Sequence, residues 1–192
     1  MGNNTTSMNI NVIDNFFSEE IHKEVFYQLI KRPQWSFTGG NNSNPFWHID
    51  GLENDEYFNT YLLNLIRQKT SIDDSYVPSR IYTNGQTAGQ CGYPHIDDGH
   101  LTFLYFPNLE WEIDWQGHLM FINKEGPVYE KGEYRDCTFK PNSKSDEISE
   151  VITYKPNRAV MFPAHIVHYA DAPHRLYNFL RISLAYKFEK IK

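Results

Sequence analysis

The sequence contains a His-x-Asp triplet, a spacing that could bring two metal ligands together. His95 and Asp97 are separated by Ile96 alone. In a β-strand, residues i and i+2 point to the same face, so the imidazole and the carboxylate would project side by side. On its own the triplet is weak evidence, because such triplets often arise by chance and an exposed histidine beside an aspartate is ordinary on a protein surface.

A third metal ligand is available downstream, near the end of another predicted strand. His165 and His168 both belong to the segment Phe162 to His168. The residues alone do not choose between the two histidines, because an extended segment places them on opposite sides whereas a turn brings them together. Two histidines and one carboxylate on one face of an octahedral ion leave positions open for a co-substrate and dioxygen, an arrangement typical of non-haem Fe(II) oxygenases.

The last predicted strand adds a charged residue with no obvious partner. Strand alternation gives this segment two faces, one with Phe179, Arg181, Ser183 and Ala185, and a core face with Leu180, Ile182, Leu184 and Tyr186. Burying Arg181 without an anion would be costly, and a guanidinium binds a carboxylate through two hydrogen bonds. Ser183 could donate a further hydrogen bond to that carboxylate. A dicarboxylate co-substrate would satisfy both, and the alternative is that Arg181 pairs with an acidic residue of this chain.

The elements that must position these residues change in character along the chain. Helical periodicity predicts a helix near 18–31, with Ser18 as its N-cap, and a second helix after Asn54, both lying against a sheet. The Gly- and Asn-rich stretch from Trp35 to Trp47 favours a loop. Later aromatic and β-branched runs predict strands around 79–83, 93–97, 101–106, 117–122, 150–155, 159–162 and 179–188. A charged segment, 123–149, reads as a long excursion between strands. Helices first and strands later indicate an α+β fold.

Composition limits the classes of protein. A chain of 192 residues fits one domain, 1–192, and an aromatic content of 16% favours strands because flat rings pack well on a pleated surface. The net charge of −6, with scattered basic residues, disfavours a nucleic-acid partner. Cys91 and Cys137 show no disulfide framework, which favours a cytoplasmic setting. The sequence has no long apolar run and no signal peptide, so export and membrane spanning are disfavoured.

The ordered set of candidate residues resembles the 2-oxoglutarate oxygenases of the prolyl 4-hydroxylase-like superfamily. The resemblance covers about 75–192 and is closest to the small members from bacteria and viruses. It rests on His95-Ile96-Asp97, His168 and Arg181-Ile182-Ser183, on the blocks Arg80 to Gln86, Leu104 to Trp111 and Trp115 to His118, and less specifically on Trp35 and Pro45 to His48. Two positions depart from the family pattern, since Gly117-His118 stands in place of a Gly-Gly pair and Phe106 stands where a tyrosine is common.

The resemblance implies a distorted double-stranded β-helix of the jelly-roll, cupin-like kind. Helical support would come from about 8–75 and the β-helix core from about 76–190. The resemblance selects His168 over His165 as the third ligand, by its distance to Arg181, so that His95, Asp97 and His168 would hold Fe(II). The 5-carboxylate of 2-oxoglutarate would meet Arg181 and Ser183. In relatives, tyrosines on neighbouring strands reach the co-substrate or the substrate, and the residues expected in that role are Tyr82 and Tyr105.

The implied activity is hydroxylation of a substrate C–H bond, with dioxygen consumed and 2-oxoglutarate converted to succinate and CO2. Ascorbate is an optional addition to the cofactors. The leading substrate is a prolyl residue in a peptide or protein, and the alternative is another side chain or a small molecule. Two further alternatives are a zinc site made by His165, His168 and His174, and a β-barrel module without catalysis. A monomer or a homodimer is expected.

Overall fold

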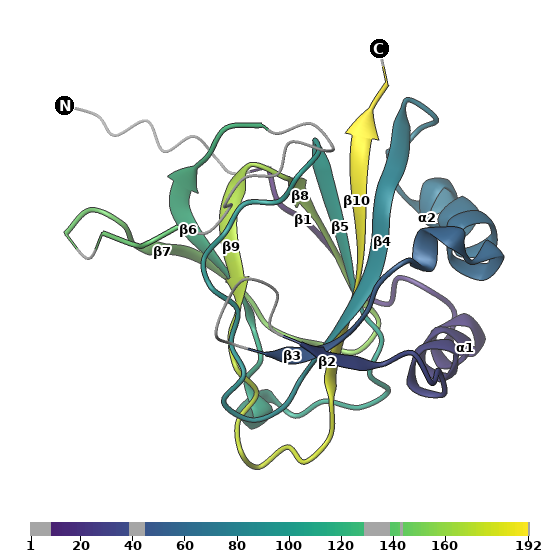
Figure 1. Cartoon of the computed structure of the whole chain (residues 1–192), viewed down its shortest axis with the longest axis horizontal. Helices are drawn as coiled ribbons and strands as arrows, with labels where there is room; N and C mark the ends of the chain where they lie inside the picture. Colours follow the sequence, from purple (N-terminus) through teal and green to yellow (C-terminus); the bar gives the residue numbers. More distant parts are fainter. Residues whose placement is uncertain (1–8, 39–44, 129–138, 143, 192) are drawn as a thin grey trace.

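The chain folds into two antiparallel β-sheets with helices against the outer face of the larger one (Figure 1). A computed structural model describes residues 9–38, 45–128, 139–142 and 144–191. The larger sheet has the strand order β1-β8-β5-β10-β4-β3-β2, and the smaller sheet has the order β7-β6-β9. The strands are β1 (Asn11–Ile13), β2 (Ser36–Thr38), β3 (Phe46–Ile49), β4 (Tyr76–Gln86), β5 (Leu101–Phe106), β6 (Leu119–Glu125), β7 (Ile148–Ile152), β8 (Arg158–Pro163), β9 (Ile166–Ala170) and β10 (Arg181–Lys190).

The helices cover the outer face of the large sheet. They are α1 (Glu19–Ile30), the 3-10 turn η1 (Leu52–Asn54), the π-helix η2 (Tyr57–Leu62) and α2 (Leu63–Lys69), whereas a further 3-10 turn, η3 (Ile113–Trp115), lies between β5 and β6. Ser18 caps α1 as predicted, and its hydroxyl accepts from the Ile21 backbone N–H. The apolar faces of α1, η2 and α2 pack on outward residues of β4, β5 and β10, which explains why both sequence segments repeat apolar residues at helical spacing.

The inner face of the large sheet carries the candidate site residues. Alternation along the paired strands places one set of side chains on this face: Tyr82, Asn84 and Gln86 on β4, Arg181, Ser183, Ala185 and Lys187 on β10, and Thr102, Leu104 and Phe106 on β5. A second core cluster joins the two sheets, with Leu104 and Val160 from the large sheet meeting Leu119 and Phe121 from the small one. The inner faces are therefore apolar towards β8 and polar along β4 and β10.

Several predicted elements differ from those observed. The stretch from Trp35 to Trp47 was expected to be a loop, but β2 and β3 lie at its two ends and pair with each other, while residues 39–44 fall outside the described part. These strands are too short to show a clear alternation. The predicted strand 93–97 is reduced to a single bridge between His95 and His168. Phe179 precedes β10 and is 46% exposed, so it does not belong to the last strand.

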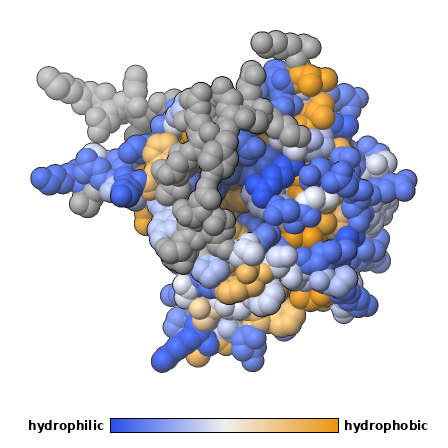
Figure 2. Space-filling model, in the orientation of Figure 1, coloured by the Kyte–Doolittle hydropathy of each residue, from blue (hydrophilic) through white to orange (hydrophobic). Residues whose placement is uncertain are grey.

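Within the predicted excursion 123–149, β6 extends to Glu125 and β7 begins at Ile148, and residues 129–138 and 143 lie outside the described part. Among the described residues, no helix is long and apolar enough to cross a membrane. The face shown in Figure 2 is mostly hydrophilic, with its apolar side chains in separate patches.

Candidate metal centre and anion site

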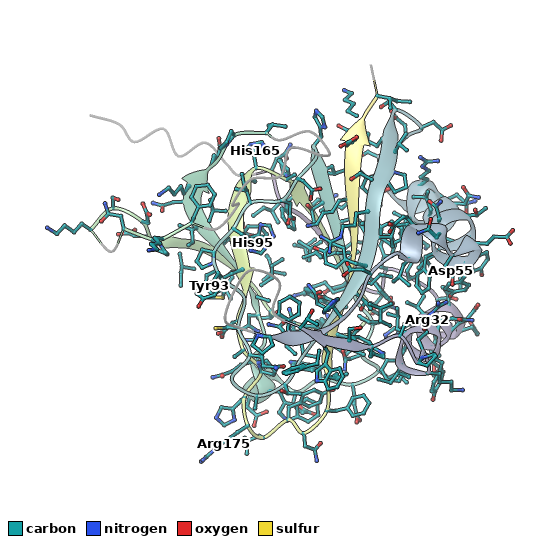
Figure 3. All side chains as sticks on the ribbon, viewed as in Figure 1. Arg32, Asp55, Tyr93, His95, His165 and Arg175 are labelled. Atoms are coloured by element: carbon teal, nitrogen blue, oxygen red, sulfur yellow. The ribbon has the colours of Figure 1, made fainter. Side chains whose placement is uncertain are left out.

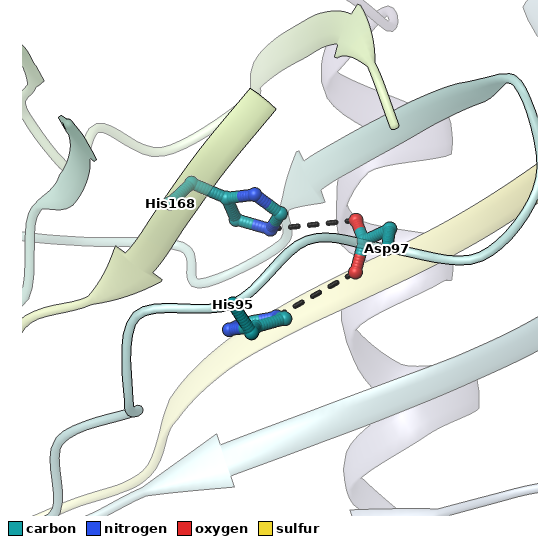
Figure 4. A group of neighbouring side chains, drawn as sticks. All are labelled: His95, Asp97 and His168. Carbon is teal, nitrogen blue, oxygen red and sulfur yellow. Dashed lines mark ion pairs between the residues drawn. The ribbon is translucent and has the colours of Figure 1, made fainter. Parts of the chain in front are cut away.

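Three side chains from two parts of the fold converge on one point. His95 Nε2 lies 3.5 Å from Asp97 Oδ1, and His168 Nε2 lies 3.3 Å from Asp97 Oδ2 (Figure 4). One ligand atom from each of the three residues lies within 4.8 Å of the others, so the three side chains are close enough to share a metal ion. Within the described residues this is the one group of histidine, cysteine and acidic side chains that could hold a metal.

The two histidines are oriented for metal binding by hydrogen bonds on their far nitrogens. His95 Nδ1 lies 2.7 Å from the carbonyl oxygen of Tyr93, and His168 Nδ1 lies 2.8 Å from that of Ile166. A carbonyl only accepts, so Nδ1 carries the proton and Nε2 presents its lone pair to the site. The backbones of His95 and His168 also exchange two hydrogen bonds, of 3.0 and 2.9 Å, which fix the rings relative to each other.

The protonation states suit a metal site. Burial lowers the pKa of His168, although Asp97 partly opposes this, so the imidazole is neutral near pH 7. Burial alone would raise the pKa of the Asp97 carboxyl, but the Lys187 ammonium holds it well below its ordinary value. The site therefore offers neutral imidazole and ionised carboxylate, the forms that bind metal.

Two residues that the sequence interpretation missed, Thr102 and Lys187, hold Asp97. Thr102 Oγ1 donates to Asp97 Oδ2 at 2.6 Å, and the Lys187 ammonium forms an ion pair with the same oxygen. Lys187 is only 2% exposed and lies on the inner face of β10, as Arg181 and Ser183 do. The sequence could have indicated Lys187, because it lies on the same alternating face as Arg181 and its charge is as costly to bury.

Arg181 is buried among neutral partners. Its side chain is 1% exposed, Nε donates to the Gly117 carbonyl at 2.6 Å, and Nη1 donates to Gln86 Oε1 at 2.9 Å. In the described part of the chain no acidic side chain forms an ion pair with it, and Asp171 acts on it only from a longer distance, by raising its pKa, so the alternative of direct pairing with a structural acid finds no support. Burial lowers the pKa of Arg181 to about 10, and the guanidinium still stays charged near pH 7.

The wall around Arg181 explains why Gly117 is needed. Gly117 has φ +70°, and a Cβ there would lie 3.0 Å from Arg181 Cδ and 3.2 Å from the Trp111 ring. The Arg181 guanidinium lies 4.8 Å from the centre of the Tyr154 ring, and Tyr154 stacks on Phe106. Tyr154, which the sequence interpretation did not single out, thus lines this site together with Phe106.

Ser183 and Tyr82 lie on the same inner face as Arg181. Ser183 is 7% exposed and pairs with Asn84 across the sheet. Tyr82 lies nearer the triad, and its ring centre is 5.7 Å from Lys187 Nζ. The structure therefore brings Tyr82 beside the metal site, at the Lys187 end of β10.

Tyr105 is not brought to the site. Its ring packs against Phe16 and Phe17 under the helices, and its hydroxyl donates to Asn157 Oδ1 at 2.9 Å. Alternation along β5 sends Leu104 and Phe106 inward and Tyr105 outward. The expectation that Tyr105 contacts a co-substrate therefore finds no support in its placement, and it is a packing residue.

The remaining histidines lie apart from the triad. His165 Nε2 lies 3.9 Å from Glu125 Oε2, and His165 is not part of the group that could hold a metal. His174 accepts a hydrogen bond from the Leu176 backbone, and His100 and His118 accept from the Lys190 and Tyr154 backbones. The structure therefore joins His168, not His165, to His95 and Asp97, and the alternative zinc cluster is not formed among the described residues.

Comparison with solved structures finds the same architecture in several enzymes. A prolyl-4-hydroxylase from Pseudomonas putida superposes with a TM-score of 0.66 at 10% identity, covering 96% of this chain and 94% of that one. The fold is a double-stranded β-helix. The epimerase SnoN from nogalamycin biosynthesis shares this β-helix with a TM-score of 0.63 at 10% identity, covering 94% and 78% of the two chains. HygX from Streptomyces hygroscopicus shares it with a TM-score of 0.59 at 8% identity, covering 94% and 83%.

The likeness is one of structure and not of sequence. No family model matches the sequence, and no curated protein matches it either. The β-helix expected from the resemblance is confirmed, with α1 and α2 supporting the large sheet as expected.

Proposed function

We propose that this chain is an Fe(II)- and 2-oxoglutarate-dependent dioxygenase that hydroxylates a C–H bond of its substrate. The observation that carries the proposal is the combination of a His95–Asp97–His168 group that could hold a metal with Arg181, a buried cation whose hydrogen-bond partners are neutral. Two solved structures with this fold support it, since SnoN was crystallised with Fe³⁺ and alpha-ketoglutarate, and HygX with nickel and 2-oxoglutarate.

The donor atoms fit the proposed metal. Two imidazole nitrogens and one carboxylate are the set used by non-haem Fe(II) oxygenases, and they leave positions for further ligands. His95 has 37% of its side chain exposed, whereas Asp97 and His168 have 5% each, so the site is open on the His95 side. When bound, iron and 2-oxoglutarate would supply the oxidation, in which dioxygen converts 2-oxoglutarate to succinate and CO2 while the substrate is hydroxylated.

The residues of this chain would orient the metal ligands and bind the co-substrate. The Tyr93 and Ile166 carbonyls hold the two imidazoles with Nε2 towards the metal. Arg181, held by Gly117 and Gln86, would bind the 5-carboxylate of 2-oxoglutarate, and Ser183 on the same face would donate a second hydrogen bond. The rings of Phe106 and Tyr154, which lie against the Arg181 guanidinium, would limit the access of water to this carboxylate.

As the substrate we propose a prolyl residue in a peptide or protein. The likeness to the Pseudomonas putida prolyl-4-hydroxylase supports this choice, because it extends over nearly the whole of both chains. Tyr93, whose carbonyl holds His95, is 42% exposed beside the open side of the site, and Figure 3 shows it next to His95. Exposed aromatic rings are a usual surface for docking proline-containing peptides.

The test is a turnover assay with matched peptides. Purified protein is given Fe(II), 2-oxoglutarate and dioxygen with proline-containing peptides, or with the same peptides carrying alanine at each proline, and succinate and peptide mass are measured. We expect proline-dependent succinate release and a gain of one oxygen atom in the peptide, both lost in Asp97→Ala. Succinate release that no peptide stimulates would keep the oxygenase and reject the prolyl substrate. The absence of succinate under every condition would reject the oxygenase.

A further inference from the structure

Lys187 is a buried charged residue that the proposed chemistry does not yet use. It is 2% exposed, and its ammonium pairs with Asp97, a candidate metal ligand. It also lies 3.3 Å from Thr102 Oγ1, which itself donates to Asp97. Thr102 and Lys187 are direct partners across β5 and β10, so their positions are fixed by the register of the large sheet. This closed network has a consequence for how Asp97 can coordinate a metal.

The position of the Asp97 carboxylate does not decide whether one or two oxygens would bind a metal. Oδ1 faces His95 Nε2 and Oδ2 faces His168 Nε2, as Figure 4 shows, so both oxygens border the site. Carboxylates bind metals through either one or two oxygens. The choice must therefore come from the other partners of the two oxygens.

Those partners are distributed unequally. Oδ2 accepts from Thr102 and from Lys187, which together use both of its lone pairs. Oδ1 has only the His95 contact among the side chains of the described residues. Both donors to Oδ2 are buried, with Thr102 0% and Lys187 2% exposed. Leaving a buried donor without its acceptor costs free energy. Oδ1 is thus the oxygen left for a metal.

We propose that Lys187 and Thr102 are positioning residues that restrict Asp97 to coordination through Oδ1. The proposal rests on the proposed function and explains a requirement of it. Three protein ligands occupy half of an octahedral ion, and the rest must accept two atoms of 2-oxoglutarate and one of dioxygen. A second oxygen from Asp97 would occupy one of those positions and compete directly with 2-oxoglutarate.

The test uses Co(II) in place of Fe(II), because its visible absorption reports coordination and no turnover is needed. Lys187→Met and Thr102→Val each remove one donor to Oδ2 with little change in size. We expect both variants to show an altered Co(II) spectrum, Co(II) affinity equal to or higher than that of the wild type, and 2-oxoglutarate affinity of the Co(II)-loaded protein about tenfold lower. Thr102→Ser, which keeps the hydroxyl, and Lys190→Met, at an exposed position of β10, should match the wild type.

The opposite directions of the two affinities separate positioning from damage. A misfolded site would bind both Co(II) and 2-oxoglutarate more weakly, and a parallel loss in both Lys187→Met and Thr102→Val would overturn the proposal. Folded variants with the wild-type spectrum and wild-type 2-oxoglutarate affinity would overturn it equally. If wild-type protein binds Co(II) but no 2-oxoglutarate, the proposed function fails, whereas the spectra of the two variants still decide how Asp97 coordinates.

Discussion

Arg181 and Lys187 project from the same face of β10 and are both almost fully buried, at 1% and 2% exposure. Lys187 has an acidic partner in Asp97, whereas the hydrogen bonds of Arg181 go to Gly117 and Gln86, which are neutral. Among the described residues, Lys187 thus has a carboxylate in direct contact, whereas Arg181 has none in ion-pair contact and only Asp171 acting from farther away. Since a buried charge without an ion-pair partner is costly, this difference is the basis of our proposal that Arg181 binds an anion from outside.

Replacing Arg181 should weaken 2-oxoglutarate binding and leave metal binding intact. Arg181→Ala removes charge-assisted hydrogen bonds worth about 1.5–3 kcal/mol, so we expect the Kd for 2-oxoglutarate to rise about 10- to 100-fold. Calorimetric titration of the metal-loaded protein measures this. Arg175→Ala is the matched control, because Arg175 is exposed on the loop before β10 and lies far from the labelled His95 in Figure 3. If the two variants bound 2-oxoglutarate with equal affinity, Arg181 would not be the residue that binds its carboxylate.

His168 and His165 provide a matched pair for the metal site. His168→Ala removes a member of the triad, so Co(II) binding should be lost or reduced by more than about tenfold. His165→Ala should bind Co(II) as the wild type does, because His165 lies near Glu125 and outside the triad. Equilibrium dialysis with metal analysis gives both values. If His165→Ala lost Co(II) binding and His168→Ala kept it, the third ligand would be His165 and not His168.

The Asp97–Lys187 pair predicts a specific pattern of stability. Asp97→Ala leaves the Lys187 ammonium buried without its partner, which should lower the free energy of unfolding by about 3–5 kcal/mol. In the double variant Asp97→Ala/Lys187→Met no charge remains to be buried, so part of that loss should be recovered. Urea unfolding of the metal-free proteins measures both. A double variant less stable than Asp97→Ala would show that the two residues do not act as a pair.

Tyr105 should affect stability and not co-substrate binding. Tyr105→Phe removes the hydrogen bond to Asn157 under the helices, which should cost about 1 kcal/mol of stability. The 2-oxoglutarate affinity of the metal-loaded protein should stay at the wild-type value, because Tyr105 lies on the outer face of β5. Thermal unfolding and calorimetric titration are the two measurements. A weaker affinity with unchanged stability would contradict this placement.

The sequence was sufficient to predict features that depend on neighbouring residues, such as the alternating faces of a strand or the cap of a helix. Alternation in the last strand predicted that Arg181 and Ser183 face away from the apolar core, and the pairing of β10 with β4 places both inward. Lys187 continues the same alternation but was overlooked, although its burial has the same energetic consequence. The N-cap at Ser18 was predicted because a serine hydroxyl can satisfy a free N–H at the start of a helix.

Other features depend on long-range pairing that a single sequence does not display. His95 and His168 meet through one bridge between distant segments, so the residues alone could not exclude His165. The outward direction of Tyr105 follows from the register of β5 against β10 and β8. The pairing of Thr102 with Lys187 likewise depends on that register, because no sequence pattern links either residue to Asp97.

The anaerobic addition of Fe(II) and 2-oxoglutarate to the purified chain tests the proposed oxygenase site as a whole. Chelation of iron by the co-substrate gives a weak visible metal-to-ligand charge-transfer band, which needs both the triad and the anion site. We predict the band in the wild type, its absence in His168→Ala, and in Arg181→Ala its appearance only at higher 2-oxoglutarate concentration. Folded, iron-loaded wild-type protein that shows no band at saturating 2-oxoglutarate would contradict the proposal that this chain is a 2-oxoglutarate-dependent oxygenase.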